Sequence, residues 1–187
     1  MEQDKLKFHF DKPPVLESER LLLREQTLDD APALLKMRSN ELVMKYIPRP
    51  MPKSIEDVYE FLAKVQEGFM KHENLGWAIT LKDNPELLIG HIGYQNFDCA
   101  NFRAEIGYLL DPDVWGKGIA GEALRLVNDF GFDTLGLHSI YAIIDPENKA
   151  SAALLLKYGY VKEAYFKEDF YYNGQFLDSE VYGKVNG

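Results

Sequence analysis

Hydrophobic residues in the first half of the chain recur at spacings that separate strands from helices. A short apolar run at 19–26 predicts a strand, and the following segment, 27–40, predicts a helix with Thr27 as its cap. Three prolines indicate a loop over 46–54. Beyond the loop, one apolar face repeats at helical spacing through 54–71. The chain therefore begins with a strand followed by two helices.

The middle of the chain changes to the alternation that is typical of strands. Apolar runs at 75–82, 87–96 and 102–110 are separated by turn-forming residues, so an antiparallel meander is expected. A glycine-rich segment then opens a helix over 118–135. The pattern closes with three further elements: a strand at 138–145, a helix at 148–159, and a hairpin of 160–172 and 175–185 that turns at Asn173-Gly174.

These elements predict a single α/β (α+β) domain. A helix separates the strands 102–110 and 138–145, which makes them a right-handed parallel crossover within an otherwise antiparallel sheet. We expect a central, mixed, mostly antiparallel twisted sheet of about seven strands with helices on both faces. Residues 1–18 are interpreted as an N-terminal arm and 19–187 as the domain.

Charge and composition limit the classes of molecule that the protein is expected to bind. The formal charge is −9, from 30 acidic against 21 basic residues, which excludes nucleic acid as a natural partner. The acidic surface favours a cationic substrate through steering, or serves solubility alone. No apolar run approaches the ~20 residues that span a bilayer, so no membrane partner is expected. A single cysteine, Cys99, and no export signal predict a cytoplasmic protein.

The segment "DVWGKGIAGEAL" contains the strongest chemical signal. Gly116, Gly118 and Gly121 stand where the helix begins, and bare amides at a helix N-terminus bind phosphate. The run also matches G-x-G-x-x-G, with Asp145 placed to bind a ribose. A dinucleotide fold is disfavoured because five residues separate the strand from the glycines and too little chain follows. A turn that needs glycine only for packing remains a further alternative.

The run "AEIGYLLDPDVWGKGIAGEAL" resembles the acyl-CoA site of the GNAT superfamily of N-acetyltransferases, in which a (Arg/Gln)-x-x-Gly-x-(Gly/Ala) loop holds the CoA diphosphate. The match here is Trp115, Gly118 and Ala120, with Trp115 in place of the usual Arg or Gln. That departure, with "ERLLLR", "HSIYAIIDPENKAS" and "YYNGQFLDSEVYG", is similar to the ribosomal-protein (RimJ/RimL-type) N-terminal acetyltransferases. The resemblance covers about Glu19 to Val185.

The resemblance implies a set of residues for acetyl-CoA, the expected acetyl donor. The main chain of Leu109 and Leu110 should bind the pantetheine arm, and Asn148 should meet the cofactor, although Asn is also a good helix cap. The full set of expected cofactor-binding residues is Leu109, Leu110, Trp115, Gly116, Lys117, Gly118, Ile119, Ala120, Gly121, Asn148 and Ser151.

The implied reaction moves an acetyl group from a thioester to a neutral amine. Deprotonation at pH 7 costs about 1.1 kcal/mol for an α-amine and about 4.6 kcal/mol for a lysine-type amine, so a carboxylate base suffices for the former. Glu105 is the candidate base because it lies on the strand that carries the thioester. Its alternative is a surface glutamate paired with Arg103.

The usual acid of the family, a tyrosine, is replaced by Leu155. Ser151 is the candidate to relay a proton to the departing thiolate, or else a first-turn serine bonded to the backbone. The loss is tolerable, since protonating a thiol at pH 7 is worth only about 2 kcal/mol. The four histidines show no metal-ligand spacing, so no metal is expected.

The amine acceptor is the least legible feature of the sequence. The resemblance places its site between the loop 45–52 and the C-terminal hairpin, with Trp77, Tyr94, Phe170 and Tyr172 as candidate lining residues. A protein or peptide α-amine is the leading acceptor. A polyamine, aminosugar or amino acid acceptor and a non-catalytic acyl-CoA-binding module are alternatives. The chain is expected to be a monomer or a homodimer, since the hairpin offers a free strand edge.

Overall fold

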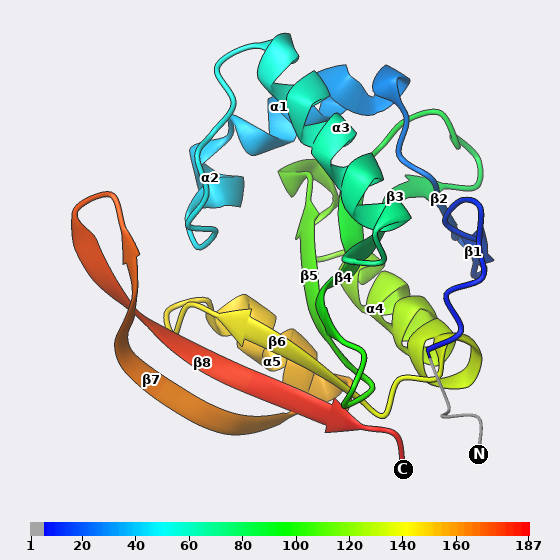
Figure 1. The fold of residues 1–187 in the computed structure, drawn as a ribbon. Coiled ribbons are helices and arrows are strands. Elements are labelled where there is room, and N and C mark those ends of the chain that lie inside the picture. The colour runs from blue at the N-terminus through cyan, green and yellow to red at the C-terminus, as the bar shows by residue number, and fades with distance from the viewer. Residues whose placement is uncertain (1–5) are drawn as a thin grey trace.

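A computed structural model describes residues 6–187, and these residues form one eight-stranded mixed sheet with helices on both faces (Figure 1). The strand order is β1-β2-β3-β4-β5-β6-β8-β7, one strand more than the expected seven because the short β1 adds to the edge. The strands are β1 (Leu16–Glu17), β2 (Leu21–Arg24), β3 (Asn74–Leu81), β4 (Gly90–Asp98), β5 (Arg103–Leu110), β6 (Ser139–Ile144), β7 (Val161–Tyr172) and β8 (Gln175–Val185).

Two groups of helices cover the sheet, each over its own hydrophobic core. Figure 1 shows α1 and α3 on one side of the sheet and α4 on the other. Leu34, Val58 and Leu109 belong to the core under α1 and α3, whereas Leu110 and Leu124 belong to the core under α4 and α5. The helices are α1 (Ala31–Arg38), α2 (Glu41–Met44), α3 (Ile55–Met70), α4 (Ile119–Asp129) and α5 (Lys149–Lys157), with a π-helical turn, η3 (Phe130–Leu135), after α4.

The sheet confirms the expected strand pairing. β3, β4 and β5 form an antiparallel meander, and β5 pairs with β6 in parallel. The C-terminal hairpin turns at Asn173 and Gly174, both of which have positive φ (49° and 81°), as Asn-Gly turns require. Its strand β8 pairs with β6, so the long strand β7 forms the free edge of the sheet.

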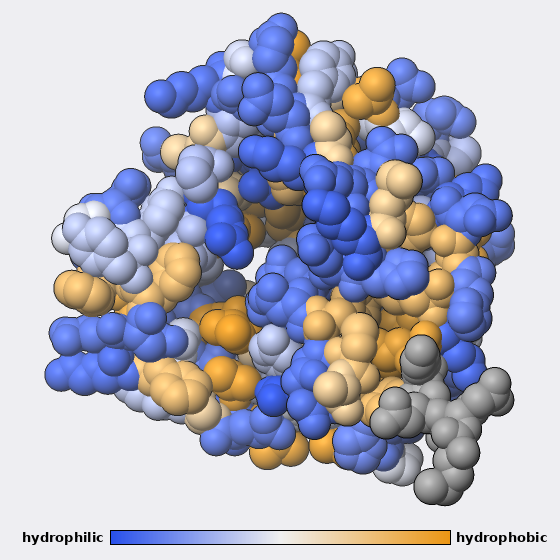
Figure 2. All heavy atoms as spheres, viewed as in Figure 1, coloured by the Kyte–Doolittle hydropathy of each residue, from blue (hydrophilic) through white to orange (hydrophobic). Residues whose placement is uncertain are grey.

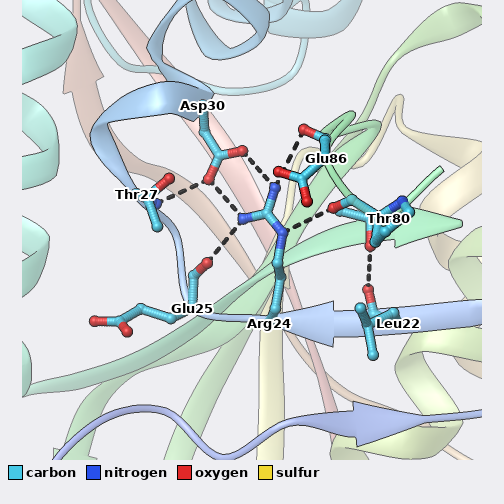
Figure 3. Close-up of polar contacts among 8 residues, drawn as sticks. Leu22, Arg24, Glu25, Thr27, Asp30, Thr80 and Glu86 are labelled. Atoms are coloured by element: carbon cyan, nitrogen blue, oxygen red, sulfur yellow. Dashed lines mark hydrogen bonds and ion pairs between the residues drawn. The ribbon is translucent and has the colours of Figure 1, made fainter. Parts of the chain in front are cut away.

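A buried ion pair attaches the first helices to the sheet (Figure 3). The two guanidinium nitrogens Nη1 and Nη2 of Arg24 lie 2.9 and 2.7 Å from the carboxylate of Asp30, and Arg24 Nε donates to Pro85 O at 2.9 Å. Asp30 also accepts from the N–H of Thr27 at 2.8 Å, which caps the start of the helical segment as predicted. The hydrogen bonds that Arg24 donates to Asp30 raise the pKa of Arg24. The bidentate contact therefore fixes how α1 leaves β2.

Residues 6–18, which the sequence analysis separated as an arm, lie on the sheet and its helices. Leu6 and Phe8 are buried in the core beneath α4, and Trp77 Nε1 donates to Pro14 O at 2.6 Å. Lys7 N–H also donates to Leu135 O at 3.0 Å. The described part of the N-terminal segment thus packs as part of the same body as the rest of the chain.

Candidate active site

The two parallel strands at the centre of the sheet part after only three residue pairs. Their pairing ends at Glu105 and Tyr141, beyond which β5 continues to Leu110 and β6 to Ile144 without a shared ladder. Figure 1 shows the two strands diverging. Backbone groups along the open part of β5 are therefore available to an extended ligand in place of the missing strand.

The register decides which backbone groups face this gap. Asp111 N–H donates to Ile89 O at 2.9 Å, so every second residue back along β5, including Leu109, turns its peptide groups toward β4. Those of Tyr108 and Leu110 face the gap instead. The expectation for Leu110 is consistent with this geometry, but that for the main chain of Leu109 is wrong, because its N–H and C=O pair with His91 on β4.

Trp115, which stands where the family usually has Arg or Gln, fastens the glycine loop to the end of β5. Its indole Nε1 donates to Leu110 O at 3.0 Å, while the ring is about half exposed (49%). The carbonyl of Leu110 is thereby satisfied, and its N–H remains directed into the gap. The indole hydrogen bond of Trp115 thus holds the glycine loop against the end of β5.

The glycine loop itself is open to solvent. Gly116 and Gly118 are exposed and have φ of 71° and 77°, a region that other residues avoid. A Cβ at Gly116 would meet no atom within 4 Å, and one at Gly118 would meet only Arg20 Nη2 at 3.6 Å. The alternative of a turn that needs glycine for packing is therefore not supported at these two positions.

The N-terminus of α4 offers unpaired donors. Among residues 6–187, the first N–H after Trp115 to find a main-chain acceptor is that of Glu122, which donates to Gly118 O at 3.1 Å. The N–H groups between them, together with the positive end of the helix dipole, form an anion site of the kind that binds phosphate. The exposed Lys117 side chain adds positive charge beside it.

Not every residue of the loop has the role that the sequence suggested. The ring of Tyr158 packs directly on Gly121, so a side chain there would clash with it; this glycine serves the contact between α4 and the end of α5. Ile119 is only 4% exposed and belongs to the core, and Ala120 is half-buried. Ile119 and Gly121 therefore offer a ligand only their backbone N–H groups.

The ion pair between Arg20 and Glu122, which was not expected from the sequence, holds the glycine loop in place. Arg20 donates from Nη1 to Lys117 O at 3.1 Å and from Nε to Glu122 at 2.8 Å, and Ser18 Oγ donates to Glu122 at 2.5 Å. The hydrogen bonds from Ser18 and Arg20 hold the pKa of Glu122 below its usual value, against the effect of its partial burial. The segment "ERLLLR" contains this arginine, but its partner Glu122 lies 102 residues further along the chain, so local sequence does not reveal the pair.

Across the gap, the first turn of α5 meets β5 through two hydroxyls. The side chain of Asn148 caps α5 by accepting from Ser151 N–H at 3.1 Å, which is the capping role considered for it, and its amide nitrogen is free for another partner. Ser151 Oγ is 2.6 Å from the hydroxyl of Tyr108 rather than bonded to the backbone. Burial raises the pKa of Tyr108 to about 12, although the hydrogen bond with Ser151 opposes the shift.

Glu105 lies at the point where β5 and β6 separate. It is buried (8% exposed), and its two carboxylate oxygens accept from Gln95 Nε2 and Asn96 Nδ2, both at 2.8 Å. Asn96 sits in a bulge of β4 with φ of 52°, a conformation that Asn tolerates and that brings its amide to the carboxylate. Arg103 instead lies over the ring of Tyr141 at 4.2 Å, so the expected alternative of a Glu105–Arg103 pair is not formed.

The candidate acceptor face is the face of the sheet that bears Glu105. Cross-strand register places Gly76, Gly93 and Gly107 side by side on it, and a Cβ at Gly107 would meet nothing within 4 Å. Trp77 and Tyr94, suggested as lining residues, point to the opposite face and are buried in the core beneath α4. Alternation along each strand explains the correction, since both residues neighbour glycines of the acceptor face.

A groove of about 660 Å³ opens between the segment after α1 and the tip of the hairpin. Figure 2 shows this face of the molecule hollowed between the helices above and the hairpin below. Tyr172 lines the groove as expected, whereas Phe170 is not among its lining residues. The full lining is Ser39, Glu41, Met44, Lys45, Ile47, Arg49, Pro50, Met51, Pro52, Lys53, Tyr172 and Asn173.

Neither a metal-binding cluster nor a membrane-spanning helix is found in the described part of the chain. Residues 6–187 contain no group of three His, Cys, Asp or Glu side chains arranged to hold a metal ion. In the same range no helix combines the length and the apolar character needed to cross a bilayer.

Comparison with known proteins agrees with this geometry. Residues 20–161 match the model of the acetyltransferase (GNAT) domain family. The chain is 37% identical to the uncharacterized N-acetyltransferase YoaA of Bacillus subtilis, over 92% of this chain and 97% of that protein. It is 36% identical to the spermidine N(1)-acetyltransferase of Escherichia coli K12, over 84% of this chain and 81% of that protein.

A solved structure shares the fold over almost its whole length. The ribosomal-protein-S5-alanine acetyltransferase of Vibrio fischeri superposes with a TM-score of 0.80 at 26% identity, covering 92% of this chain and 97% of that one. A doubly wound dinucleotide fold is excluded, because the sheet is mixed and mostly antiparallel.

Proposed function

Because the chain belongs to the GNAT family of acetyltransferases, we propose an acceptor and a set of catalytic residues for its reaction. The protein is an acetyl-CoA-dependent N-acetyltransferase, and the proposal is that it acetylates the α-amine of a peptide or protein. The observation that carries the acetyl-transfer chemistry is the open cofactor site: unpaired N–H groups at the start of α4 lie beside the gap between β5 and β6. The choice of acceptor is argued separately below.

In this proposal the parted strands hold the cofactor. The diphosphate is bound by the N–H groups of residues 116–121, with Lys117 at the rim, because these are the unpaired donors at a helix N-terminus. The pantetheine arm runs along β5 and bonds to the backbone of Tyr108 and Leu110, which face the gap. Asn148 contacts the arm from α5 with the amide nitrogen that its capping bond leaves free.

Glu105 is the proposed base. The amine nitrogen attacks the thioester carbon, and the carboxylate accepts the proton that the nitrogen loses, directly or through a water. Gln95 and Asn96 orient the carboxylate by donating to each of its oxygens at 2.8 Å. The bare strand surface at Gly107 leaves room for the amine between Glu105 and the gap.

Tyr108, with Ser151, is the proposed acid. As the carbon–sulfur bond breaks, the phenol donates its proton to the sulfur and recovers one through Ser151 Oγ, 2.6 Å away. A pKa of about 12 keeps Tyr108 protonated at neutral pH, as an acid must be. Tyr108 thereby replaces the tyrosine that the family carries where this chain has Leu155.

The α-amine is preferred because a carboxylate base suffices for it, whereas a lysine-type amine costs about 3.5 kcal/mol more to deprotonate at pH 7. The S5-alanine acetyltransferase of Vibrio fischeri, similar at 26% identity, supports this choice. A polyamine acceptor is the second candidate, since the spermidine acetyltransferase of Escherichia coli is 36% identical.

The test is thiol release from acetyl-CoA in the presence of a panel of amines. We expect turnover with peptides that have a free N-terminus and none with the same peptides after N-terminal blocking. Turnover with spermidine but not with peptides would replace the α-amine by the polyamine. No turnover above the hydrolysis background with any amine would contradict the catalytic proposal.

A further inference from the structure

Arg38, at the end of α1, is a largely buried cation without an anionic partner. Its guanidinium lies over the ring of Phe61 at 4.3 Å. Within residues 6–187 it forms no ion pair, and no acidic side chain lies near enough to raise its pKa, which burial lowers. Partly buried charges are normally paired, because removing a charge from water is costly.

A second arginine adds to the uncompensated positive charge around Arg38. The charge of Arg49 lies close enough to lower the pKa of Arg38 further, and Arg49 lines the groove between the helices and the hairpin. Lys45 and Lys53 line the same groove, against Glu41 as the acid of that lining. Lys45 lies over the ring of Tyr46 at 4.8 Å and feels the charges of Tyr46, Asp145 and Glu147. Among residues 6–187, neither Arg49 nor Lys53 forms an ion pair, so the positive charge of the lining is not compensated there.

The patch adjoins the face that holds the proposed base. The positive charge of Arg38 also lies close enough to His91 to lower its pKa, after the larger effect of burial. His91 is opposite Leu109 in the register of β4 and β5. Continuing along β5 on the same face, the next positions are the bare Gly107 and then Glu105. An acceptor whose amine reaches Glu105 can therefore extend along this face over His91 toward the two arginines.

The local charge is opposite to that of the whole molecule. A chain of net charge −9 should attract a polyamine, yet the groove is lined by Lys45, Arg49 and Lys53 against the single acid Glu41. Arg38 does not line the groove, but its charge and that of Arg49 are close enough to repel one another. Repulsion between like charges in a partly buried site is relieved by an anion. The guanidinium group matches carboxylate and phosphate geometry through paired N–H donors.

We propose that the acceptor carries a carboxylate or phosphate group near its amine, and that Arg38 and Arg49 bind this group. This inference rests on the proposed function and specifies its substrate: an α-amine with a nearby anion, supplied by an acidic side chain of a peptide or by the carboxylate of a free amino acid. A polyamine lacks such a group and meets repulsion at the same place.

The test compares acceptors that differ only in charge. Peptides with Glu, Gln or Lys at position two, and again at position three, are assayed with saturating acetyl-CoA, alongside free glutamate and its diamide. We expect kcat/KM for the Glu peptide of at least one series to exceed that for the Gln peptide roughly tenfold, with the Lys peptide lower still. A preference for free glutamate over both peptides would identify the amino acid as the source of the carboxylate.

Variants of the two arginines test whether these residues cause the preference for an acidic acceptor. Arg49→Gln, at an exposed position, should raise KM for the preferred anionic acceptor roughly tenfold and raise that for the Gln peptide by a clearly smaller factor. Arg38→Gln should act in the same direction, and Arg38→Lys keeps the charge if the glutamine variant fails to fold. Arg125→Gln is the matched control, because Arg125 is an exposed arginine of α4.

The failures of the two proposals differ. Absence of acetyl transfer to every amine would contradict the catalytic proposal, whereas transfer at equal rates to Glu, Gln and Lys peptides and to both forms of glutamate would overturn the anion site alone. Faster transfer to spermidine or to the Lys peptide would also overturn it. An acidic preference that survives in both arginine variants would place the anion elsewhere.

Discussion

The hydroxyl of Tyr108 and Ser151 Oγ are 2.6 Å apart, and this contact joins β5 to the first turn of α5 across the cofactor gap. Tyr108 lies beyond Glu105, the last residue of β5 that pairs with β6, and Ser151 lies in the first turn of the helix that follows β6. Tyr108 lies on one side of β5 and Glu105 on the other, because side chains alternate along a strand. The proposed acid and base therefore lie on opposite sides of one strand.

Removing the phenol should slow chemistry without weakening cofactor binding. Protonation of a thiol at pH 7 is worth about 2 kcal/mol, so we expect Tyr108→Phe to lower kcat up to about thirtyfold with KM for acetyl-CoA unchanged. Ser151→Ala should lower kcat less, because it removes only the relay. Steady-state kinetics measure both. A raised KM with unchanged kcat would assign Tyr108 to binding instead.

Glu105→Gln is nearly isosteric and tests the base. We expect kcat/KM to fall about a hundredfold, a value within the usual range for general bases, and the loss to be largest at low pH, where the amine is protonated. Asn96→Ala should cause a smaller loss, since it removes one of the two donors that orient the carboxylate. A pH–rate profile that Glu105→Gln leaves unaltered would remove this residue from the mechanism.

His91 should make stability depend on pH. Burial, and secondarily Arg38, lower its pKa from 6.5 to about 4, so the unfolded chain binds the proton more readily than the folded one. Stability is then full above pH 6.5 and declines as the pH falls toward 4, by at most about 3 kcal/mol from this group.

Urea unfolding at pH 7.5 and pH 5 measures this dependence. The difference in unfolding free energy between the two pH values should be smaller in His91→Gln than in the wild type. Only the difference is compared, because the substitution also alters packing at both pH values. An equal pH dependence in the two proteins would show that His91 is not the titrating group.

Much of the fold was predictable from local signals. The meander, the parallel crossover and the Asn-Gly hairpin each depend on apolar periodicity or on turn residues, and all three are confirmed. The short β1 was missed because two residues carry no periodicity. α2 was missed because it has only four residues, about one helical turn, which is too short to show a helical period.

The site was predictable only in part, because its geometry depends on contacts between distant segments. The open conformation of Gly116 and Gly118 agrees with the expected anion site, but Gly121 is explained by Tyr158, which is far away in sequence. The donors Gln95 and Asn96 reach Glu105 only through a bulge, and the choice of Leu110 over Leu109 depends on strand register. None of these follows from the order of residues alone.

Gly118 offers the most direct test of the account, because its φ of 77° places the start of α4 against the proposed diphosphate. Gly118→Val should impose strain and obstruct the loop, and Gly136→Val is the matched control: Gly136 has φ of 84° and no atom within 4 Å of an added Cβ. Strain alone affects both variants, whereas loss of the anion site affects only the first.

The decisive measurement is calorimetric binding of acetyl-CoA and of acetyl-pantetheine, which lacks the diphosphate, to the wild type and both variants. We expect the wild type to bind acetyl-CoA at least a hundredfold more tightly than acetyl-pantetheine, which also lacks the adenosine and its 3′-phosphate. The advantage should fall by at least tenfold in Gly118→Val and be retained in Gly136→Val. Equal affinity of the wild type for the two ligands, or an undiminished advantage in Gly118→Val, would contradict the claim that the start of α4 binds the diphosphate.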